Sequence, residues 1–235
     1  MTRYADLREQ VWRANRDLAE AGLAVLSFGN ASGVDRRAGV LAIKPSGVPY
    51  RELRPESVVV VALDDGRVVD GQLRPSSDTP THLALCRRFE EIGGVVHTHS
   101  TFATAWAQAC RPIPCLGTTH ADHFRGSVPV TRALTRAEIE GDYELETGNV
   151  IVETLEASGL APLEVPAVLV AGHGPFTWGP SPAGAVENAI ALETVAALAL
   201  RTAQLQPGIE QIGRGLLDRH FSRKHGPAAY YGQGR

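Results

Sequence analysis

Residues 77–100, SDTPTHLALCRRFEEIGGVVHTHS, contain a helix signal followed by a strand signal, and together these set the fold class. Two capping residues, Ser and Asp, precede Pro80, and proline is favoured in the first turn of a helix. We therefore expect a helix from about Pro80 to Phe89. The segment from Val95 to Ser100, which begins with two valines, then predicts a buried strand.

The same alternation continues on both sides of this stretch. Apolar residues recur at helical spacing from Leu7 to Leu18, a capping box begins at Thr135, and Ser181-Pro182 opens a long apolar helix. Further strands are expected at Ala24–Ser27, Val40–Lys44, Ser57–Leu63 and Ala167–Ala171. No repeat or long linker interrupts the pattern, so we expect one α/β domain over residues 1–235, with a sheet covered on both faces.

Composition excludes several classes of protein. The 235 residues are 43% hydrophobic and carry a formal net charge of -3, so the chain can bury a full core and has no basic field for nucleic acid. Charges recur through the first eight residues, so we expect no signal peptide, no membrane span and a cytoplasmic location. The three cysteines form no C-x-x-C pair and are expected to be reduced.

Two histidines in the strand at Val95–Ser100 suggest a metal site. His97 and His99 are two residues apart, so their side chains should project to the same side of a strand. His173, between two glycines at the end of another expected strand, is a third candidate ligand, and Asp78 a fourth. The alternative is that each imidazole is simply hydrogen-bonded in the core.

Polar turns suggest a phosphate site. Ser46 and Gly47 follow Lys44 in a turn whose amides can bind an anion, and Ser76 and Ser77 lie at an expected helix N-terminus. A third polar turn, at Gly29 and Asn30, joins this set. Taken alone, each turn also fits ordinary capping chemistry.

Two places offer groups for proton transfer. Asp122 ends the polar cluster Thr118–Asp122 and is able to move protons if it lies near a substrate. Tyr231 lies in an aromatic pair near the C-terminus, where chain ends are usually polar, which suggests that the tail docks on protein. The alternatives are a solvated loop carboxylate and mere packing of the two rings.

These motifs, taken together, resemble those of the class II aldolase/epimerase family. The first set is GNAS from Gly29, KPSG from Lys44, PSSDTPTH from Pro75, VHTHS from Val96 and GTTHAD from Gly117. The second set looks like the L-ribulose-5-phosphate 4-epimerases in particular: ETGNVIVET from Glu146, GHGPF from Gly172 and LDRHFSRKHGPAAYYGQ from Leu217. The resemblance covers nearly the whole chain.

The resemblance implies a three-layer α/β domain with a central, largely antiparallel sheet between helices, in a cyclic homotetramer with active sites between adjacent subunits. It implies one Zn²⁺ per subunit, with Mn²⁺ or Co²⁺ as substitutes, bound by His97, His99, His173 and, more weakly, Asp78. It assigns substrate binding, including the phosphate, to the turn residues (Gly29, Asn30, Lys44, Ser46, Gly47, Ser76, Ser77). Asp122 and Tyr231 form the implied proton-transfer pair, with Tyr231 reaching in from the neighbouring subunit.

The implied reaction interconverts L-ribulose 5-phosphate and D-xylulose 5-phosphate. A carbon-carbon bond breaks in a retro-aldol step, the aldehyde fragment rotates, and the bond re-forms on its other face. The main alternative is an aldolase of the L-fuculose 1-phosphate type, in which a Glu typically stands where this chain has Asp78. A non-catalytic relative, such as a cytoskeletal head domain, is a further alternative, but it need not retain the histidines. The sequence leaves open whether the pathway served is that of L-arabinose, of L-ascorbate or another.

Overall fold

One seven-stranded sheet lies at the centre of the computed structural model, which describes residues 3–159, 161–226 and 229–230. The strands follow the order β4-β3-β2-β1-β5-β7-β6, and each neighbouring pair is antiparallel. Their bounds are β1 Asn30–Asp35, β2 Val40–Ile43, β3 Val59–Ala62, β4 Val68–Asp70, β5 Gly94–His97, β6 Ala167–Leu169 and β7 Pro175–Gly179.

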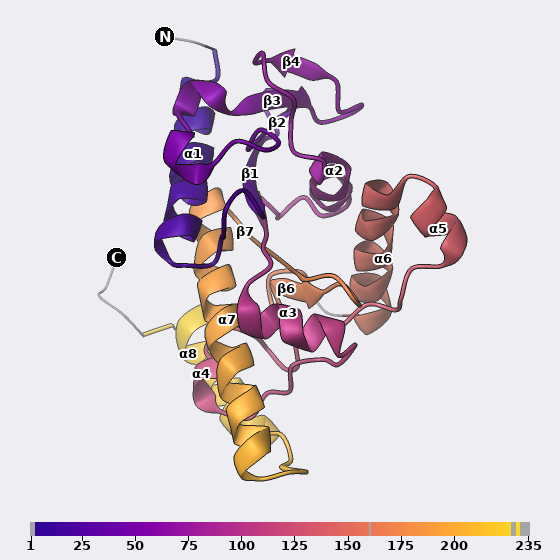
Figure 1. Ribbon diagram of the computed structural model, residues 1–235. Helices are drawn as coiled ribbons and strands as arrows, with labels where there is room; N and C mark the ends of the chain where they lie inside the picture. The colour runs from indigo at the N-terminus through magenta and orange to yellow at the C-terminus, as the bar shows by residue number, and fades with distance from the viewer. Residues whose placement is uncertain (1–2, 160, 227–228, 231–235) are drawn as a thin grey trace.

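Helices cover both faces of this sheet. Helices α1 and α7 lie on one side of it, and α2 and α6 lie on the other (Figure 1). The helices are α1 Ala5–Glu20, α2 Thr79–Arg88, α3 Thr101–Gln108, α4 Thr118–Ala121, α5 Arg136–Glu140, α6 Tyr143–Ser158, α7 Pro182–Leu205 and α8 Arg214–His225, with 3-10 turns η1 Tyr50–Glu52 and η2 Pro55–Ser57. This arrangement confirms the expected three-layer α/β domain with an antiparallel sheet.

Alternation along β2 shows why both layers are needed. Val40 and Ala42 pack in one apolar cluster with Val11 of α1, whereas Leu41 and Ile43 pack in another with residues of α2. Successive side chains of a strand point to opposite faces, so a strand that is apolar throughout must be covered twice. Each fully buried Leu or Ile side chain stabilises the fold by about 1.5–3 kcal/mol.

The prediction of a strand at Ala24–Ser27 is wrong. This segment is a loop, and the strand β1 begins later, at Asn30, where the sequence had indicated a turn. Leu26 has a positive φ of 58° and is 74% exposed, so the backbone leaves the extended region in the middle of the apolar run. Local apolar character therefore gave the wrong position for this strand.

The strand predicted at Val95–Ser100 exists, but β5 ends at His97. His99 thus lies beyond the strand, and the alternation argument that placed His97 and His99 on one side does not apply. Two helix starts are confirmed: Thr135 forms a capping box with Glu138, and the Ser181 side chain accepts a hydrogen bond from the Gly184 amide.

Helix α7 is, among the helices described, the one long and apolar enough to cross a membrane by length and composition. In the fold it packs against β5, β7 and α3. Its inward face is buried: Pro182, Ala185, Val186, Ala189, Ala191, Leu192, Val195, Ala196 and Ala199. Such burial is typical of the core helix of a globular domain.

Candidate functional site

A hollow of about 350 Å³ lies where β1 begins and β5 ends. Among the described residues, it brings together every predicted site residue except Asp122. The lining residues are Ser27, Phe28, Gly29, Asn30, Lys44, Pro45, Ser46, Gly47, Ser76, Ser77, Asp78, His97, His99 and His173. The predicted metal and phosphate residues therefore share one site.

Three imidazoles converge in this hollow. One nitrogen from each of His97, His99 and His173 lies within 4.8 Å of the other two, and the Nε2 atoms of His97 and His99 are 3.1 Å apart. His97 is buried, His173 is partly buried in the turn between β6 and β7, and His99 is exposed. Three nitrogens at this spacing fit a divalent cation with one position left open for a substrate.

The protonation of His97 suits a metal ligand. Its Nδ1 lies 3.0 Å from the Pro175 carbonyl oxygen, and this bond requires the proton on Nδ1, which leaves the Nε2 lone pair directed at the other histidines. Burial, and then the neighbouring His173 and His99, hold the pKa of His97 well below its usual value. Burial also lowers the pKa of His173. Neutral imidazoles are the form that binds metal.

Two glycines allow the backbone to pack closely around the histidines. A Cβ at Gly29, which has a φ of +77°, would lie 2.7 Å from the His97 carbonyl oxygen. A Cβ at Gly174 would lie 2.9 Å from the Thr98 carbonyl oxygen and 3.6 Å from a ring atom of His97. Any larger side chain at either position would push the strand end and the imidazoles apart.

The predicted fourth ligand, Asp78, lines the hollow but does not belong to the close histidine group. Its Oδ2 accepts a 2.6 Å hydrogen bond from Asn30 Nδ2, which also donates to Ser76 Oγ at 3.0 Å. Asn30 Oδ1 is buried without a hydrogen-bond partner. An unsatisfied buried acceptor in a hollow is a natural partner for a ligand hydroxyl.

The two predicted phosphate turns lie side by side. The Ser46 amide donates to the Arg74 carbonyl and the Ser76 amide to the Lys44 carbonyl, at 2.9 and 3.0 Å, so the segments are paired like short antiparallel strands. Ser77 lines the hollow and lies just before α2, at the helix end where free amides favour negative charge. Lys44 is 2% exposed, and burial lowers its pKa to about 8.

Asp122 belongs to another region, the α4–α8 corner. It follows α4, and its carboxylate accepts hydrogen bonds from Arg223 at 2.9 and 2.6 Å and contacts His220 Nδ1 at 3.0 Å. Burial acts to raise its pKa, but the hydrogen bonds from Arg223 and His220 outweigh burial and lower it. Within one chain, Asp122 does not line the hollow. Tyr231 lies outside the described residues.

Sequence reasoning missed several residues that contact the site. The Tyr143 hydroxyl lies 3.4 Å from His173 Nδ1, and the Tyr50 hydroxyl contacts the backbone at Gly29. Each tyrosine lies three residues from a quoted motif, Tyr50 after KPSG and Tyr143 before ETGNVIVET, but nothing local distinguishes either from a packing residue. The tail residues His220 and Arg223 lie in the motif that begins at Leu217, but their pairing with Asp122 comes only from the packing of α8 on α4.

Comparison with known proteins supports the family resemblance. Residues 9–200 match the family described as Class II Aldolase and Adducin N-terminal domain. The chain is 53% identical to the L-ribulose-5-phosphate 4-epimerase UlaF of Salmonella paratyphi A (strain ATCC 9150 / SARB42) over 227 residues, which cover 97% of this chain and 98% of that protein. The same protein from Salmonella typhi matches equally well.

Solved structures share the fold. An L-fuculose 1-phosphate aldolase superposes with a TM-score of 0.77 at 22% identity, covering 93% of this chain and 95% of that one. The L-fuculose-1-phosphate aldolase from Thermus thermophilus gives a TM-score of 0.65, also at 22% identity, and covers 88% and 98% of the two chains. At these identities the likeness establishes the architecture alone.

Proposed function

The chain belongs to the class II aldolase and adducin N-terminal domain family, and on this premise we propose that it is an epimerase interconverting L-ribulose 5-phosphate and D-xylulose 5-phosphate. One observation carries the proposal: in a chain closely related to an epimerase of that name, three histidines and two phosphate turns share one hollow. The test is to incubate the purified protein with L-ribulose 5-phosphate and assay D-xylulose 5-phosphate. If no product forms while the metal is bound, the proposal is wrong.

The histidine group would hold a divalent cation, and we propose zinc, with Mn²⁺ or Co²⁺ as substitutes. A bound cation supplies Lewis-acid stabilisation of negative charge on substrate oxygens. Asp78, oriented by its hydrogen bond from Asn30, is the proposed weaker ligand. The orphan acceptor Asn30 Oδ1 can take a hydrogen bond from a substrate hydroxyl and so fix the sugar's orientation.

Phosphate is assigned to the polar turns that line the hollow. The hydroxyls of Ser46, Ser76 and Ser77 can donate to phosphate oxygens, and Gly47, with a φ of +69°, allows the turn whose amides face an anion. The buried ammonium of Lys44 adds positive charge beside them. A substrate held by its phosphate can release and turn its aldehyde end without leaving the site.

Proton transfer is assigned to Asp122 and the partner subunit's Tyr231. Asp122 would take the proton from the hydroxyl on the epimerised carbon, and the tyrosine would return a proton on the other face. Because Asp122 lies outside the hollow of its own chain, this role requires the α4–α8 corner to face the hollow of another copy. A ring with head-to-tail interfaces provides that arrangement, and we propose a tetramer.

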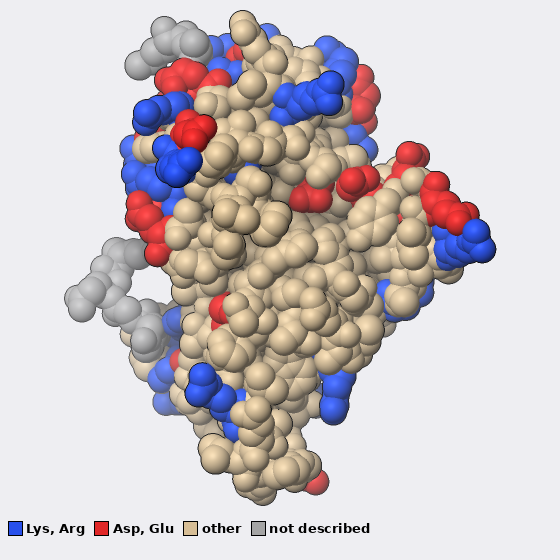
Figure 2. All heavy atoms as spheres, in the orientation of Figure 1, with Lys and Arg blue, Asp and Glu red and all other residues tan. Residues whose placement is uncertain are grey.

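The surface supports an assembly of this kind. The face over α3 and α7 carries few charged side chains compared with the region around α1 and β4 (Figure 2). Ile190, Leu198 and Leu205 of α7 are 42%, 48% and 88% exposed. Uncharged faces with exposed aliphatic residues are typical of contacts between subunits. We further propose that the enzyme acts in the cytoplasm, in pentose catabolism such as that of L-arabinose.

A further inference from the structure

Tyr50, which opens η1, contacts two groups of the site although it does not line the hollow. Its ring centroid lies 4.9 Å from the Lys44 Nζ. Its hydroxyl lies 3.0 Å from the Phe28 carbonyl oxygen and 2.8 Å from the Gly29 carbonyl oxygen. One side chain therefore contacts both the buried ammonium and the turn that leads into β1.

Lys44 has few other partners. Its Nζ makes one long hydrogen bond, 3.3 Å, to the carbonyl oxygen of the next residue, Pro45. Within the described part of the chain, no carboxylate oxygen comes within 4.0 Å of this ammonium. A buried cation without a counter-ion is costly, and the face of an aromatic ring is a favourable neighbour for it. The ring of Tyr50 therefore helps to fix the position of the Lys44 ammonium.

The hydroxyl of Tyr50 contacts a second part of the site, the turn that leads into β1. The Gly29 carbonyl that it contacts belongs to the residue packed against the backbone of His97, where a Cβ would approach within 2.7 Å. Burial, and then the negative charge of Asp78, raise the pKa of Tyr50 above its usual value, so the phenol remains a donor. The turn before β1 is thus fixed against both Tyr50 and His97.

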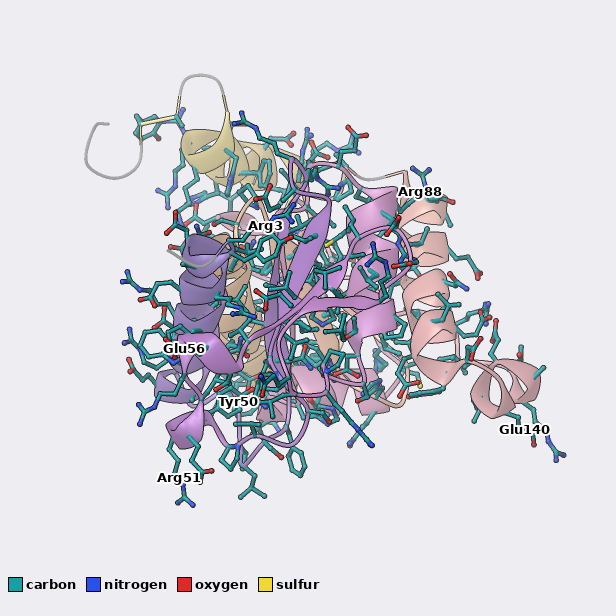
Figure 3. The ribbon with its side chains drawn as sticks, turned by 90° about the horizontal axis from the view of Figure 1, so that it is seen from above. Arg3, Tyr50, Arg51, Glu56, Arg88 and Glu140 are labelled. Carbon is teal, nitrogen blue, oxygen red and sulfur yellow. The ribbon has the colours of Figure 1, made fainter. Side chains whose placement is uncertain are left out.

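We propose that Tyr50 is a positioning residue for anion binding: its ring holds the Lys44 ammonium at the phosphate side of the hollow while its hydroxyl anchors the Phe28–Gly29 turn. This inference rests on the proposed function, because it takes the anion to be the substrate phosphate. Tyr50 lies within the body of the molecule, whereas its neighbour Arg51 points away from it (Figure 3). Arg51 therefore offers a matched control.

The test measures binding of inorganic phosphate to the metal-loaded protein by titration calorimetry. Tyr50→Leu removes ring and hydroxyl and should raise the dissociation constant about tenfold, whereas Tyr50→Phe keeps the ring and should stay within about threefold of wild type. Arg51→Ala, whose side chain is 85% exposed, should change nothing. Thermal melting of each variant checks the fold, and Tyr50→Met replaces Tyr50→Leu if the latter does not fold.

A double-variant cycle separates positioning from a general structural role. In a Lys44→Met background, Tyr50→Leu should change the dissociation constant by less than about twofold, because the ammonium it positions is gone. An equal tenfold loss with and without Lys44 overturns the inference, as does wild-type affinity in Tyr50→Leu. Failure of phosphate to bind the wild-type protein is a different result: it overturns the phosphate site of the proposed function, and the inference with it.

Discussion

The hollow beside β5 and the α4–α8 corner are built in different ways from the same chain. In the hollow, segments around residues 30, 45, 76, 97 and 173 converge on three histidines and two polar turns, all within one subunit. In the corner, Asp122 is held by Arg223 and His220 of α8. The hollow contains the proposed binding groups, and the corner contains the proposed proton-transfer group.

If the proposed roles hold, this difference means that binding groups and the proton-transfer group are separated in one chain of this fold. A single chain brings all the proposed binding groups together, but the proposed base Asp122 is directed toward α8 and not toward the hollow. Assembly of subunits would then complete the active site. Changes in the hollow should affect metal and substrate affinity, whereas changes in the corner should affect turnover and depend on the partner subunit.

The largest expected effect is removal of the metal. Chelation should abolish turnover and zinc should restore it. His99→Asn should lower both the metal content and the rate, the latter by roughly a hundredfold or more, because an amide is a poor substitute for an imidazole. Elemental analysis and an epimerase assay on the same samples measure both quantities. Full activity in metal-free protein would remove the metal from the mechanism.

The second largest expected effect is the loss of turnover when the proposed proton-transfer groups, Asp122 and Tyr231, are changed. Asp122→Asn and Tyr231→Phe should each reduce turnover by about 100- to 10,000-fold, the usual contribution of a positioned acid or base. If the two variants are unfolded and refolded together at equal ratio, about a quarter of the interfaces in a heterologous ring contain both native groups, and activity should return.

The control for that experiment is a double variant with both changes. Mixed with either single variant it offers no intact pair, so it should stay inactive. If mixed oligomers of the two single variants are verified by mass and still gain no activity, the pair is not shared between subunits. Asp122 and Tyr231 would then have to come from the same subunit.

Ser77→Ala tests the phosphate side of the hollow. Loss of a hydrogen bond to a charged group should raise the Michaelis constant by an amount equivalent to about 1.5 to 3 kcal/mol, with little change in turnover. Steady-state kinetics with L-ribulose 5-phosphate measure both. An unchanged Michaelis constant would place the phosphate elsewhere.

The lowered pKa of Lys44 predicts that phosphate affinity depends on pH. Burial lowers its pKa to about 8, so the ammonium loses its proton as the pH rises through that value and phosphate affinity should fall by several-fold. Unfolded Lys keeps its proton up to about pH 10.4, so the same shift should make the fold more stable with rising pH between these values. A Lys44→Met variant should show neither trend in phosphate titrations and chemical denaturation.

The smallest expected effect is a shift of the acidic side of the profile of kcat against pH. Arg223 and His220 lower the pKa of Asp122, so Arg223→Ala should raise that pKa and move the acid limb to higher pH by about one unit. The lowered pKa also means that the Asp122 carboxylate stabilises the fold above its unfolded pKa, a contribution lost as the pH falls through the folded one. A kcat against pH profile of the variant that coincides with wild type would show that Arg223 does not control Asp122.

Much of the fold and of the hollow was predictable from sequence. Capping residues and apolar runs located α2, α5, α7 and the strands β2 and β3, because these signals act through local backbone hydrogen bonds and burial. The same signals misplaced β1, since Leu26 adopts a left-handed conformation that apolar character does not reveal. The strands β4 and β7 were not predicted from the sequence.

The candidate metal ligands show where sequence reasoning ended. Their identities came from residue types, since imidazoles are the common ligands of divalent cations. The alternation argument for His97 and His99 failed because β5 ends at His97, yet their Nε2 atoms meet at 3.1 Å. The close approach depends on Gly29 and Gly174, whose missing side chains let three backbone segments pack together.

By itself, the sequence determined which chemical groups the protein has and the helices and strands that local signals specify. Only the tertiary structure decided which groups share a site: it joined the histidines to the phosphate turns, added Tyr50 beside Lys44, and separated Asp122 into a corner with α8. The physical reason is range. Caps and periodicity act over a few residues, whereas a site is assembled by packing of segments from Asn30 to Arg223, where burial and backbone clearance set the distances.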